Sequence, residues 1–252
     1  SPLSYEVSGS TPRDIEAADL SGDGIADLVL MSGQSITVFL NLNDGNGTLA
    51  AATQYQAEIT VRAMTLVDAD SDADLDVVVL ERGGVTVRIN DGSGGFQQSV
   101  SFPGLPVDPS GIAAGDLDAD GDTDVVTVTP FGEVQVFWTG DEVSLLTVER
   151  VDIPLRDSTC NGNLGCRPHA AALSDVDNDG DLDFVVNSPW EASLLVLTND
   201  GGVFTPGPNV EYGGEQSQSM VAGDMNADGN ADIVTADQRD GSVRTHLGRG
   251  DG

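Results

Sequence analysis

The chain of 252 residues contains no lysine: its ten basic residues are all arginine, against 42 acidic residues and a formal net charge of −32. A surface of this charge repels nucleic acid and anionic membranes, so neither is expected as a partner. No apolar run approaches the roughly 20 residues of a membrane span, so we expect no membrane insertion. Hydrophobic residues still make up 39% of the chain, which is enough for a globular core.

Cysteine is equally scarce. Cys160 and Cys166 flank the segment Asn-Gly-Asn-Leu-Gly. This short separation predicts a local disulfide and an oxidising compartment, although the sequence is also compatible with a reduced pair. The chain begins with Ser-Pro rather than Met, so any export signal is expected to have been removed or to lie outside these residues. We therefore expect an extracellular or cell-surface location.

Residues typical of an enzyme active site are few. The two histidines, His169 and His246, occur in different parts of the chain with no motif around them, and there is no Gly-x-Ser-x-Gly. The many aspartates could contain a carboxylate pair for polysaccharide cleavage, so a calcium-dependent polysaccharide lyase or hydrolase stays an alternative. No feature of the sequence selects such a pair, and the chain is not expected to be an enzyme.

What the chain has in quantity is aspartate, arranged in a repeated nine-residue pattern. The pattern begins at intervals of 49, 48, 59 and 49 residues, and the third interval is longer because of an insertion at about residues 155–168. These segments hold 21 of the 42 acidic residues. They are loop 1 (19–27), loop 2 (68–76), loop 3 (116–124), loop 4 (175–183) and loop 5 (224–232).

Each loop lies between a short apolar stretch and a β-branched run such as Val-Val-Val-Leu, and further alternating segments follow. This pattern predicts four short antiparallel strands in each unit of about 49 residues, which is typical of β-propeller blades. The C-terminal unit has three such segments, and the N-terminal Leu-Ser-Tyr-Glu-Val-Ser-Gly could supply the fourth. We predict an all-β fold in which residues 1–252 form a single five-bladed propeller domain, closed by pairing of the two ends. A section of a longer array is the alternative.

The aspartates have the spacing of a calcium loop. Positions 1, 3, 5 and 9 offer side-chain oxygens, position 7 offers a backbone carbonyl, and position 6 is usually Gly, as in a shortened EF-hand loop. Oxygen ligands without His or Cys suit calcium, whose charge offsets the repulsion between the carboxylates. We predict up to five calcium ions. Loops 3 and 4 are expected to bind best, because loops 1 and 5 have Ser21 and Asn226 at position 3 and loop 2 has Ala73 at position 6. The predicted ligands are Asp19, Ser21, Asp23, Ile25 and Asp27; Asp68, Asp70, Asp72, Asp74 and Asp76; Asp116, Asp118, Asp120, Asp122 and Asp124; Asp175, Asp177, Asp179, Asp181 and Asp183; and Asp224, Asn226, Asp228, Asn230 and Asp232.

The units resemble FG-GAP or VCBS-type repeats, the calcium-loop blades of integrin α-subunit propellers and of many bacterial secreted proteins. Gly-Asp-Leu-Asp-Ala-Asp-Gly-Asp-Thr-Asp-Val-Val and Ser-Asp-Val-Asp-Asn-Asp-Gly-Asp-Leu-Asp-Phe-Val-Val are the most specific segments. The resemblance implies calcium between the first and second strands of each blade, in modules used for adhesion, glycan binding or protein binding. Such propellers usually have seven or more blades, so five is a departure from the family pattern.

From these features we expect an extracellular, calcium-stabilised binding or adhesion module that recognises a glycan or protein on the face opposite the loops. A structural spacer or assembly domain is the main alternative. Counting six residues back from each loop gives the start of each first strand on that face: Arg13, Arg62, Ser110, His169 and Gln218. Other residues expected on this face are Phe131, Arg167, Trp190 and Arg239. The arginines could bind carboxylate or sulfate and Trp190 could stack on a sugar, or they could merely offset nearby acids and fill a gap between blades.

Overall fold

The computed structural model describes residues 3–7, 12–57, 60–81, 83–103, 110–129, 133–139, 147–152, 170–188, 193–211 and 217–251. These residues group into two compact units, of which the first contains the strands up to β8 and the second those from β9 onward. No helix in the described part of the chain has the length and apolar character needed to span a bilayer.

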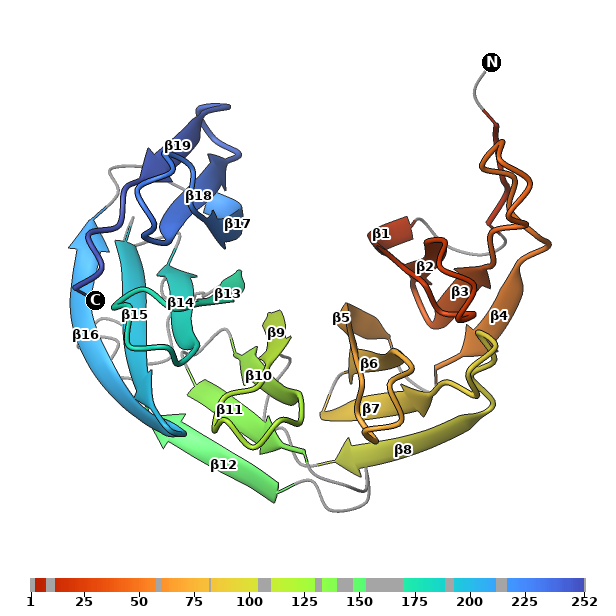
Figure 1. Cartoon of the computed structure of the whole chain (residues 1–252), viewed down its shortest axis with the longest axis horizontal. Coiled ribbons are helices and arrows are strands. Elements are labelled where there is room, and N and C mark those ends of the chain that lie inside the picture. The colour runs from red at the N-terminus through yellow and green to blue at the C-terminus, as the bar shows by residue number, and fades with distance from the viewer. Residues whose placement is uncertain are drawn as a thin grey trace. The chain divides into compact units, whose positions relative to one another are not determined.

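The described strands form five antiparallel sheets, each built from strands consecutive in sequence (Figure 1). The first sheet contains β1 (Pro12–Ala18), β2 (Asp27–Ser32), β3 (Ser35–Phe39) and β4 (Thr53–Gln56). The second contains β5 (Val61–Val67), β6 (Asp76–Glu81), β7 (Gly84–Ile89) and β8 (Gln98–Pro103). The third contains β9 (Gly111–Gly115), β10 (Asp124–Val128), β11 (Glu133–Trp138) and β12 (Thr147–Asp152). The fourth contains β13 (Ala171–Ser174), β14 (Asp183–Ser188), β15 (Ser193–Asp200) and β16 (Val203–Glu211). The fifth contains β17 (Ser217–Gly223), β18 (Asp232–Asp237) and β19 (Val243–His246).

These sheets are the blades of a five-bladed, all-β propeller, as the repeat predicted. The fifth blade has three strands, and the pairing of the two ends that would close the ring is not among the strand pairs of the described residues. Residues 3–7 form no strand. The ring of Tyr5 lies edge-on to that of Phe39 at a centroid distance of 5.9 Å, and its hydroxyl accepts the N–H of Leu49 at 2.8 Å. Ring closure, and with it the single domain, stays a prediction.

Hydrophobic cores lie between neighbouring blades within each unit. Val29 and Ile36 of the first blade pack in one cluster with Val61 and Val79 of the second. Similar clusters join the third blade to the fourth and the fourth to the fifth. The second strands of the second and third blades, β6 and β10, are covered on both faces, and this explains why their sequences are nearly continuous runs of β-branched residues rather than alternating ones. Stacking of blades is therefore the source of the core.

Two asparagines join adjacent blades at the end of the sheets where the acidic loops lie. Asn90, which follows β7, donates from its side-chain amide to the carbonyls of Leu20 at 2.9 Å and Leu75 at 3.1 Å, so it connects loop 1 with loop 2. Asn199 at the end of β15 donates to Leu117 at 2.7 Å and Leu182 at 3.1 Å, which connects loop 3 with loop 4. Both side chains are buried, and their removal would leave buried carbonyls without a donor.

We expect Asn90→Ala and Asn199→Ala each to lower the free energy of unfolding by about 2–4 kcal/mol, because each leaves one buried and one half-buried carbonyl without its donor. Asn41→Ala is the matched control. Asn41 follows β3 at the corresponding place, but among the described residues its side-chain amide donates only to the carbonyl of Ala26, at 3.3 Å, within its own blade. Its substitution should cost less than about 1 kcal/mol. Urea unfolding at fixed calcium concentration measures all three, and equal losses for Asn41 and Asn90 would contradict the role of the bridges.

Candidate metal centres in the acidic loops

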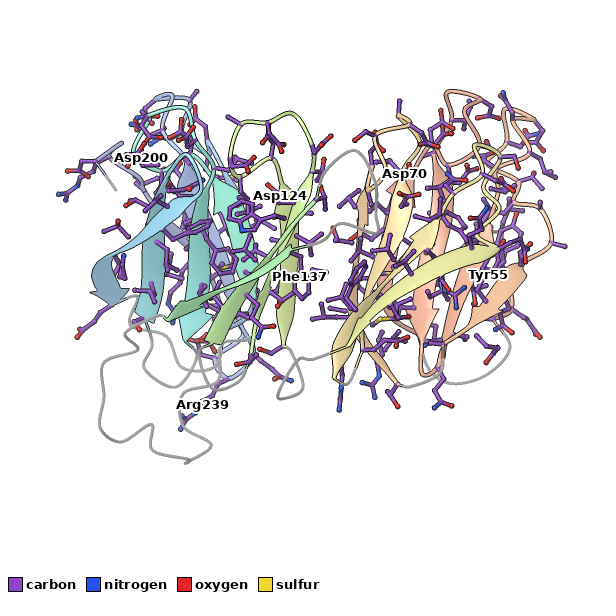
Figure 2. The ribbon with its side chains drawn as sticks, turned by 90° about the horizontal axis from the view of Figure 1, so that it is seen from below. Tyr55, Asp70, Asp124, Phe137, Asp200 and Arg239 are labelled. Carbon is purple, nitrogen blue, oxygen red and sulfur yellow. The ribbon has the colours of Figure 1, made fainter. Side chains whose placement is uncertain are left out.

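The five acidic loops each connect the first strand of a blade to the second. In the second unit, Asp124 of loop 3 lies at one end of the blades and Arg239 lies at the other (Figure 2). We call the end with the acidic loops the loop end, and the other the opposite end. Because the first strand runs directly into the loop, every blade places its acidic loop at the same point of the sheet.

The aspartate at position 9 is the most buried residue of each loop. Its side chain is 0% exposed in all five blades. One carboxylate oxygen accepts the backbone N–H of position 2 at 2.7–3.0 Å. The other accepts a backbone N–H at the end of the third strand or just beyond it, at 2.6–2.9 Å. These residues are Asp27, Asp76, Asp124, Asp183 and Asp232. Each one therefore joins its loop to the third strand, besides presenting oxygens to a cation.

The aspartates at positions 1 and 5 shape the loop through its backbone. One oxygen of position 1 accepts the N–H of position 6 at 2.7–3.1 Å in all five loops. One oxygen of position 5 accepts the N–H of position 7 at 2.9 Å in all five. The loop is thus wound around its own carboxylates, which brings their remaining oxygens together.

Winding the loop requires a left-handed backbone at two positions. Position 6 was expected from its glycines, and its φ lies between 73° and 103° in all five loops, including 73° at Ala73. The sequence did not reveal the second, position 4, where φ lies between 60° and 71°. That position is occupied by Gly22, Ser71, Ala119, Asn178 and Ala227. Only loop 1 has a glycine there, so the sequence shows no recurring glycine that would indicate a left-handed backbone at this position.

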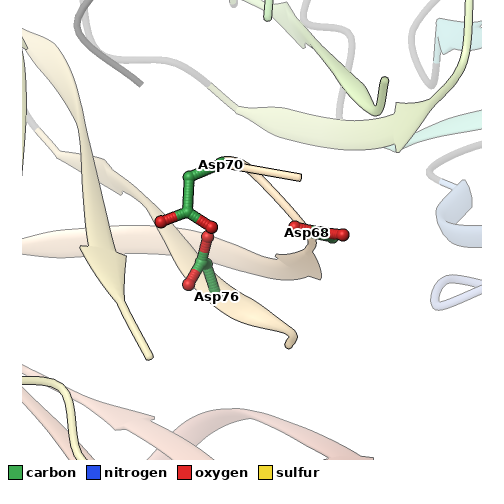
Figure 3. A group of neighbouring side chains, drawn as sticks. All are labelled: Asp68, Asp70 and Asp76. Atoms are coloured by element: carbon green, nitrogen blue, oxygen red, sulfur yellow. The ribbon is translucent and has the colours of Figure 1, made fainter. Parts of the chain in front are cut away.

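Three acidic side chains converge in loops 2, 3 and 4. In each, one oxygen from positions 1, 3 and 9 lies within 4.8 Å of the others, as Figure 3 shows for loop 2. The triads are Asp68, Asp70 and Asp76; Asp116, Asp118 and Asp124; and Asp175, Asp177 and Asp183. The Oδ1 atoms of Asp70 and Asp116 are buried and accept no hydrogen bond from the described residues. A buried carboxylate oxygen without a donor fits a cation as its missing partner.

The electrostatics of the triads also favour a cation. Burial raises the pKa of Asp76 to about 7 and that of Asp124 to about 6, with a smaller contribution from neighbouring carboxylates. Burial likewise raises the pKa of Asp183. At position 3, burial and the adjacent aspartates raise the pKa of Asp70 and Asp118. The charged form of these groups is therefore costly without a counter-charge, and a divalent ion supplies one.

Loops 1 and 5 have fewer charges at the same point. Ser21 replaces the position-3 aspartate in loop 1, and Asn226 replaces it in loop 5. The amide of Asn226 donates to Asp228 Oδ2 at 2.9 Å, so this side chain gives its loop a neutral hydrogen-bond donor where loops 2, 3 and 4 have a carboxylate. Loop 2, in contrast, brings its triad together despite the left-handed Ala73.

The residues predicted for the ligand face are described only in part. Arg13 and Arg62 are exposed near the starts of β1 and β5, away from their loops. Ser110 donates from its hydroxyl and its backbone N–H to the carbonyl of Val128. Arg239 is exposed in the turn between β18 and β19, and the backbone of Gln218 lies in β17. Phe131, Cys160, Cys166, Arg167, His169 and Trp190 lie outside the described residues, so the disulfide and the ring of ligand residues stay predictions.

We expect Ala73→Gly to raise the free energy of unfolding by about 0.5–1 kcal/mol. It removes the cost of a left-handed non-glycine residue, about 1–2 kcal/mol, and adds about 0.4–1 kcal/mol of unfolded-state entropy. Ala26→Gly at position 8 of loop 1 is the control, because Ala26 is exposed and its φ is not positive. Ala26→Gly should lower the free energy of unfolding slightly, because it adds unfolded-state entropy and relieves no strain. A loss of stability in both variants, measured by thermal unfolding, would contradict the strain at Ala73.

Comparison with known proteins agrees with this geometry. The FG-GAP-like repeat family matches residues 19–79, 68–127 and 175–235, which together are more than half of the chain. No curated protein matches it. Among solved structures, a lectin of Agrocybe aegerita, described as recognising non-reducing terminal N-acetylglucosamine, is similar with a TM-score of 0.65 at 18% identity. That match covers 94% of this chain and 66% of the lectin chain, so this chain spans a little under two thirds of the lectin's length.

Two further solved structures share the architecture. BBS1N in complex with ARL6DN has a TM-score of 0.62 at 12% identity, covering 94% of this chain and 66% of that chain. Streptogramin B lyase has a TM-score of 0.56 at 13% identity, covering 96% of this chain and 70% of that chain. Likenesses at such identities show the fold alone. The family match, the repeated aspartate loops and the five blades agree, and the chain belongs to the FG-GAP-like repeat family.

Proposed function

We propose that the chain is an extracellular binding module whose acidic loops hold calcium and whose opposite blade ends recognise a glycan or protein. The observation that carries the proposal is the convergence of three carboxylates at the same place in loops 2, 3 and 4. Loops that bring three carboxylates this close together need a cation to be stable at neutral pH, because the negative charges repel one another.

Calcium is the cation that the donors favour. Every candidate side-chain ligand is a hard oxygen donor, and calcium accepts 6–8 such ligands in flexible geometry, whereas zinc and copper prefer nitrogen or sulfur. The three triads are the strongest candidates. Loops 1 and 5 would bind more weakly, because Ser21 and Asn226 each remove one charge, and five ions are the upper limit.

The ligand is proposed to bind at the opposite blade ends. Arg13 and Arg62 are exposed at equivalent places near the starts of β1 and β5, in the same unit. Guanidinium groups bind carboxylate or sulfate bidentately, so an acidic glycan is the chemistry that such a pair favours. The lectin among the structural neighbours is consistent with glycan binding on this architecture, and we assign the chain no catalytic role.

Exchanging aspartate and asparagine at position 3 of a loop tests whether calcium stabilises the chain, because the exchange changes the charge of the loop and leaves the size of the side chain nearly unchanged. Asp118→Asn should lower calcium affinity and thermal stability in calcium, because it removes a triad ligand. In EDTA it should leave stability unchanged or raise it, since it relieves the repulsion from Asp120 that contributes to the raised pKa of Asp118. At a hundredfold excess over the dissociation constant, each native-state site contributes about 2.7 kcal/mol.

Asn226→Asp is the reciprocal variant. It restores the position-3 carboxylate in loop 5 and should increase calcium affinity while lowering stability in EDTA. Thermal melts and calcium titrations of the two variants and the parent chain measure these changes. Identical melting temperatures of the parent chain in calcium and in EDTA would rule out the calcium part of the proposal.

The ligand face is tested on a glycan array that includes sulfated and carboxylated glycans. Arg13→Ala with Arg62→Ala should abolish binding that the parent chain shows, and should leave calcium affinity and melting temperature unchanged. Arg249→Ala is the control, because Arg249 is exposed beside loop 5 at the other end of its blade. Full binding by the double variant would place the site elsewhere, and no binding of any glycan or extracellular protein would favour a spacer.

A further inference from the structure

One turn of the fourth blade contacts two acidic loops at once. It comprises residues 199–202, from the end of β15 to the start of β16. The backbone N–H of Asn199 donates to Asp183 Oδ1 at 2.8 Å, and the N–H of Gly201 donates to Asp181 Oδ2 at 2.8 Å. Asp183 is a member of the loop 4 triad. The position of the turn is therefore tied to the conformation of loop 4.

The same turn reaches the neighbouring blade. The side-chain amide of Asn199 donates to Leu117 at position 2 of loop 3, at 2.7 Å, and to Leu182 at position 8 of loop 4, at 3.1 Å. Its Oδ1 accepts the N–H of Gly202 at 2.9 Å, which closes the turn. A Cβ at Gly202 would lie only 3.3 Å from the Cβ of Asp118, so the backbone of the turn packs against a triad residue of loop 3.

This bridge between loops is made in some blades and not in others. The residues at the place of Asn199 in the other blades are Asn41, Asn90, Thr139 and Gly248. Asn90 makes the equivalent bridge between loops 1 and 2. The hydroxyl of Thr139 donates to position 8 of its own loop, at 3.0 Å, and the amide of Asn41 does so at 3.3 Å. Among the described residues, side chains at this place thus join loop 1 to loop 2 and loop 3 to loop 4.

We infer that loops 3 and 4 bind calcium as a coupled pair, with Asn199 as the positioning residue that couples them. The inference rests on the proposed calcium binding. When loop 4 is occupied, Asp183 is fixed and the turn with it, and the turn then holds Leu117 and Asp118 in place for loop 3. Ordering one loop thus meets part of the cost of ordering the other, so each ion strengthens the binding of the other. Ser21 leaves loop 1 one carboxylate short, which makes loops 3 and 4 the better pair for a test.

Repulsion between ions in neighbouring loops acts against this coupling. The two effects have opposite signs, and ionic strength separates them. In about 1 M potassium chloride the Debye length is roughly 3 Å, so the repulsion is largely screened while the contacts of Asn199 persist. The coupling is therefore measured in this salt.

Nuclear magnetic resonance of the intact chain, labelled with nitrogen-15 glycine, reports the two loops separately. The N–H of Gly121 donates to Asp116 Oδ2, and the N–H of Gly180 donates to Asp175 Oδ2, both at 3.1 Å. Each amide signal therefore follows the position-1 carboxylate of its own loop during a calcium titration.

Asp177→Asn removes a triad carboxylate from loop 4 and should lower the calcium affinity reported by Gly121 at least about fivefold. Asp118→Asn should lower the affinity reported by Gly180 by a similar factor, because coupling between two binding sites is reciprocal. A residue that only stabilises the fold would not produce this reciprocal response.

Asn199→Thr places at the bridge the residue that the third blade already uses there. In this background, Asp177→Asn should change the affinity reported by Gly121 by less than about twofold, as expected of independent sites. Asn199→Ser is the second variant if Asn199→Thr does not fold. Thr139→Ala is the matched control: it removes a hydrogen bond within loop 3 and should leave the response to Asp177→Asn intact.

Three results would count against the inference. If both glycine signals respond to calcium but Asp177→Asn leaves the affinity at Gly121 unchanged, the coupling is wrong and the proposed calcium binding stands. If the response to Asp177→Asn survives the loss of Asn199, the role of Asn199 is wrong. If neither glycine signal responds to calcium, the proposed calcium binding fails, and the coupling fails with it.

Discussion

The buried carboxylate at the end of each acidic loop is the interaction on which the rest of the structure depends. It accepts one N–H from the start of the loop and one from the end of the third strand or the residues just after it, and it does so in all five blades. A single side chain thereby positions the loop, the second strand and the third strand relative to one another. Because Asp76 and Asp124 have raised pKa values, this arrangement carries an electrostatic cost.

That cost connects the fold to its proposed function. Half of the acidic residues lie in the five loops, and the hydrogen bonds that wind each loop turn further carboxylates toward the same point. A fold of this kind is stable only if something offsets the charge. The blade architecture supplies buried oxygens, and in the proposed function a cation supplies the counter-charge, so metal binding and folding are expected to be one equilibrium. The repeated acidic pattern occurs only at the loop end of each blade, and the ligand is proposed to bind at the opposite ends.

The sequence predicted the repeated part of this structure well. The strand types, the number of blades and the place of every acidic loop follow from residues that recur at a fixed interval, and the family match and the sheets confirm them. The residues it did not reveal act between segments distant in sequence. Asn90 and Asn199 bridge two loops, which becomes evident only once the blades are stacked. Position 4 is left-handed in all five loops but is glycine only in loop 1, so composition gave no consistent indication of it. Closure of the ring would pair residues from the two ends of the chain, which local sequence patterns do not determine.

The most direct test of the account is a crystal structure grown in calcium, with anomalous scattering recorded at a wavelength where calcium contributes. The account predicts anomalous peaks within roughly 2.3–2.6 Å of carboxylate oxygens in loops 2, 3 and 4. These peaks should be strongest where Asp70 and Asp116 place their buried Oδ1 atoms. Well-ordered loops without anomalous density, in crystals saturated with calcium, would contradict it.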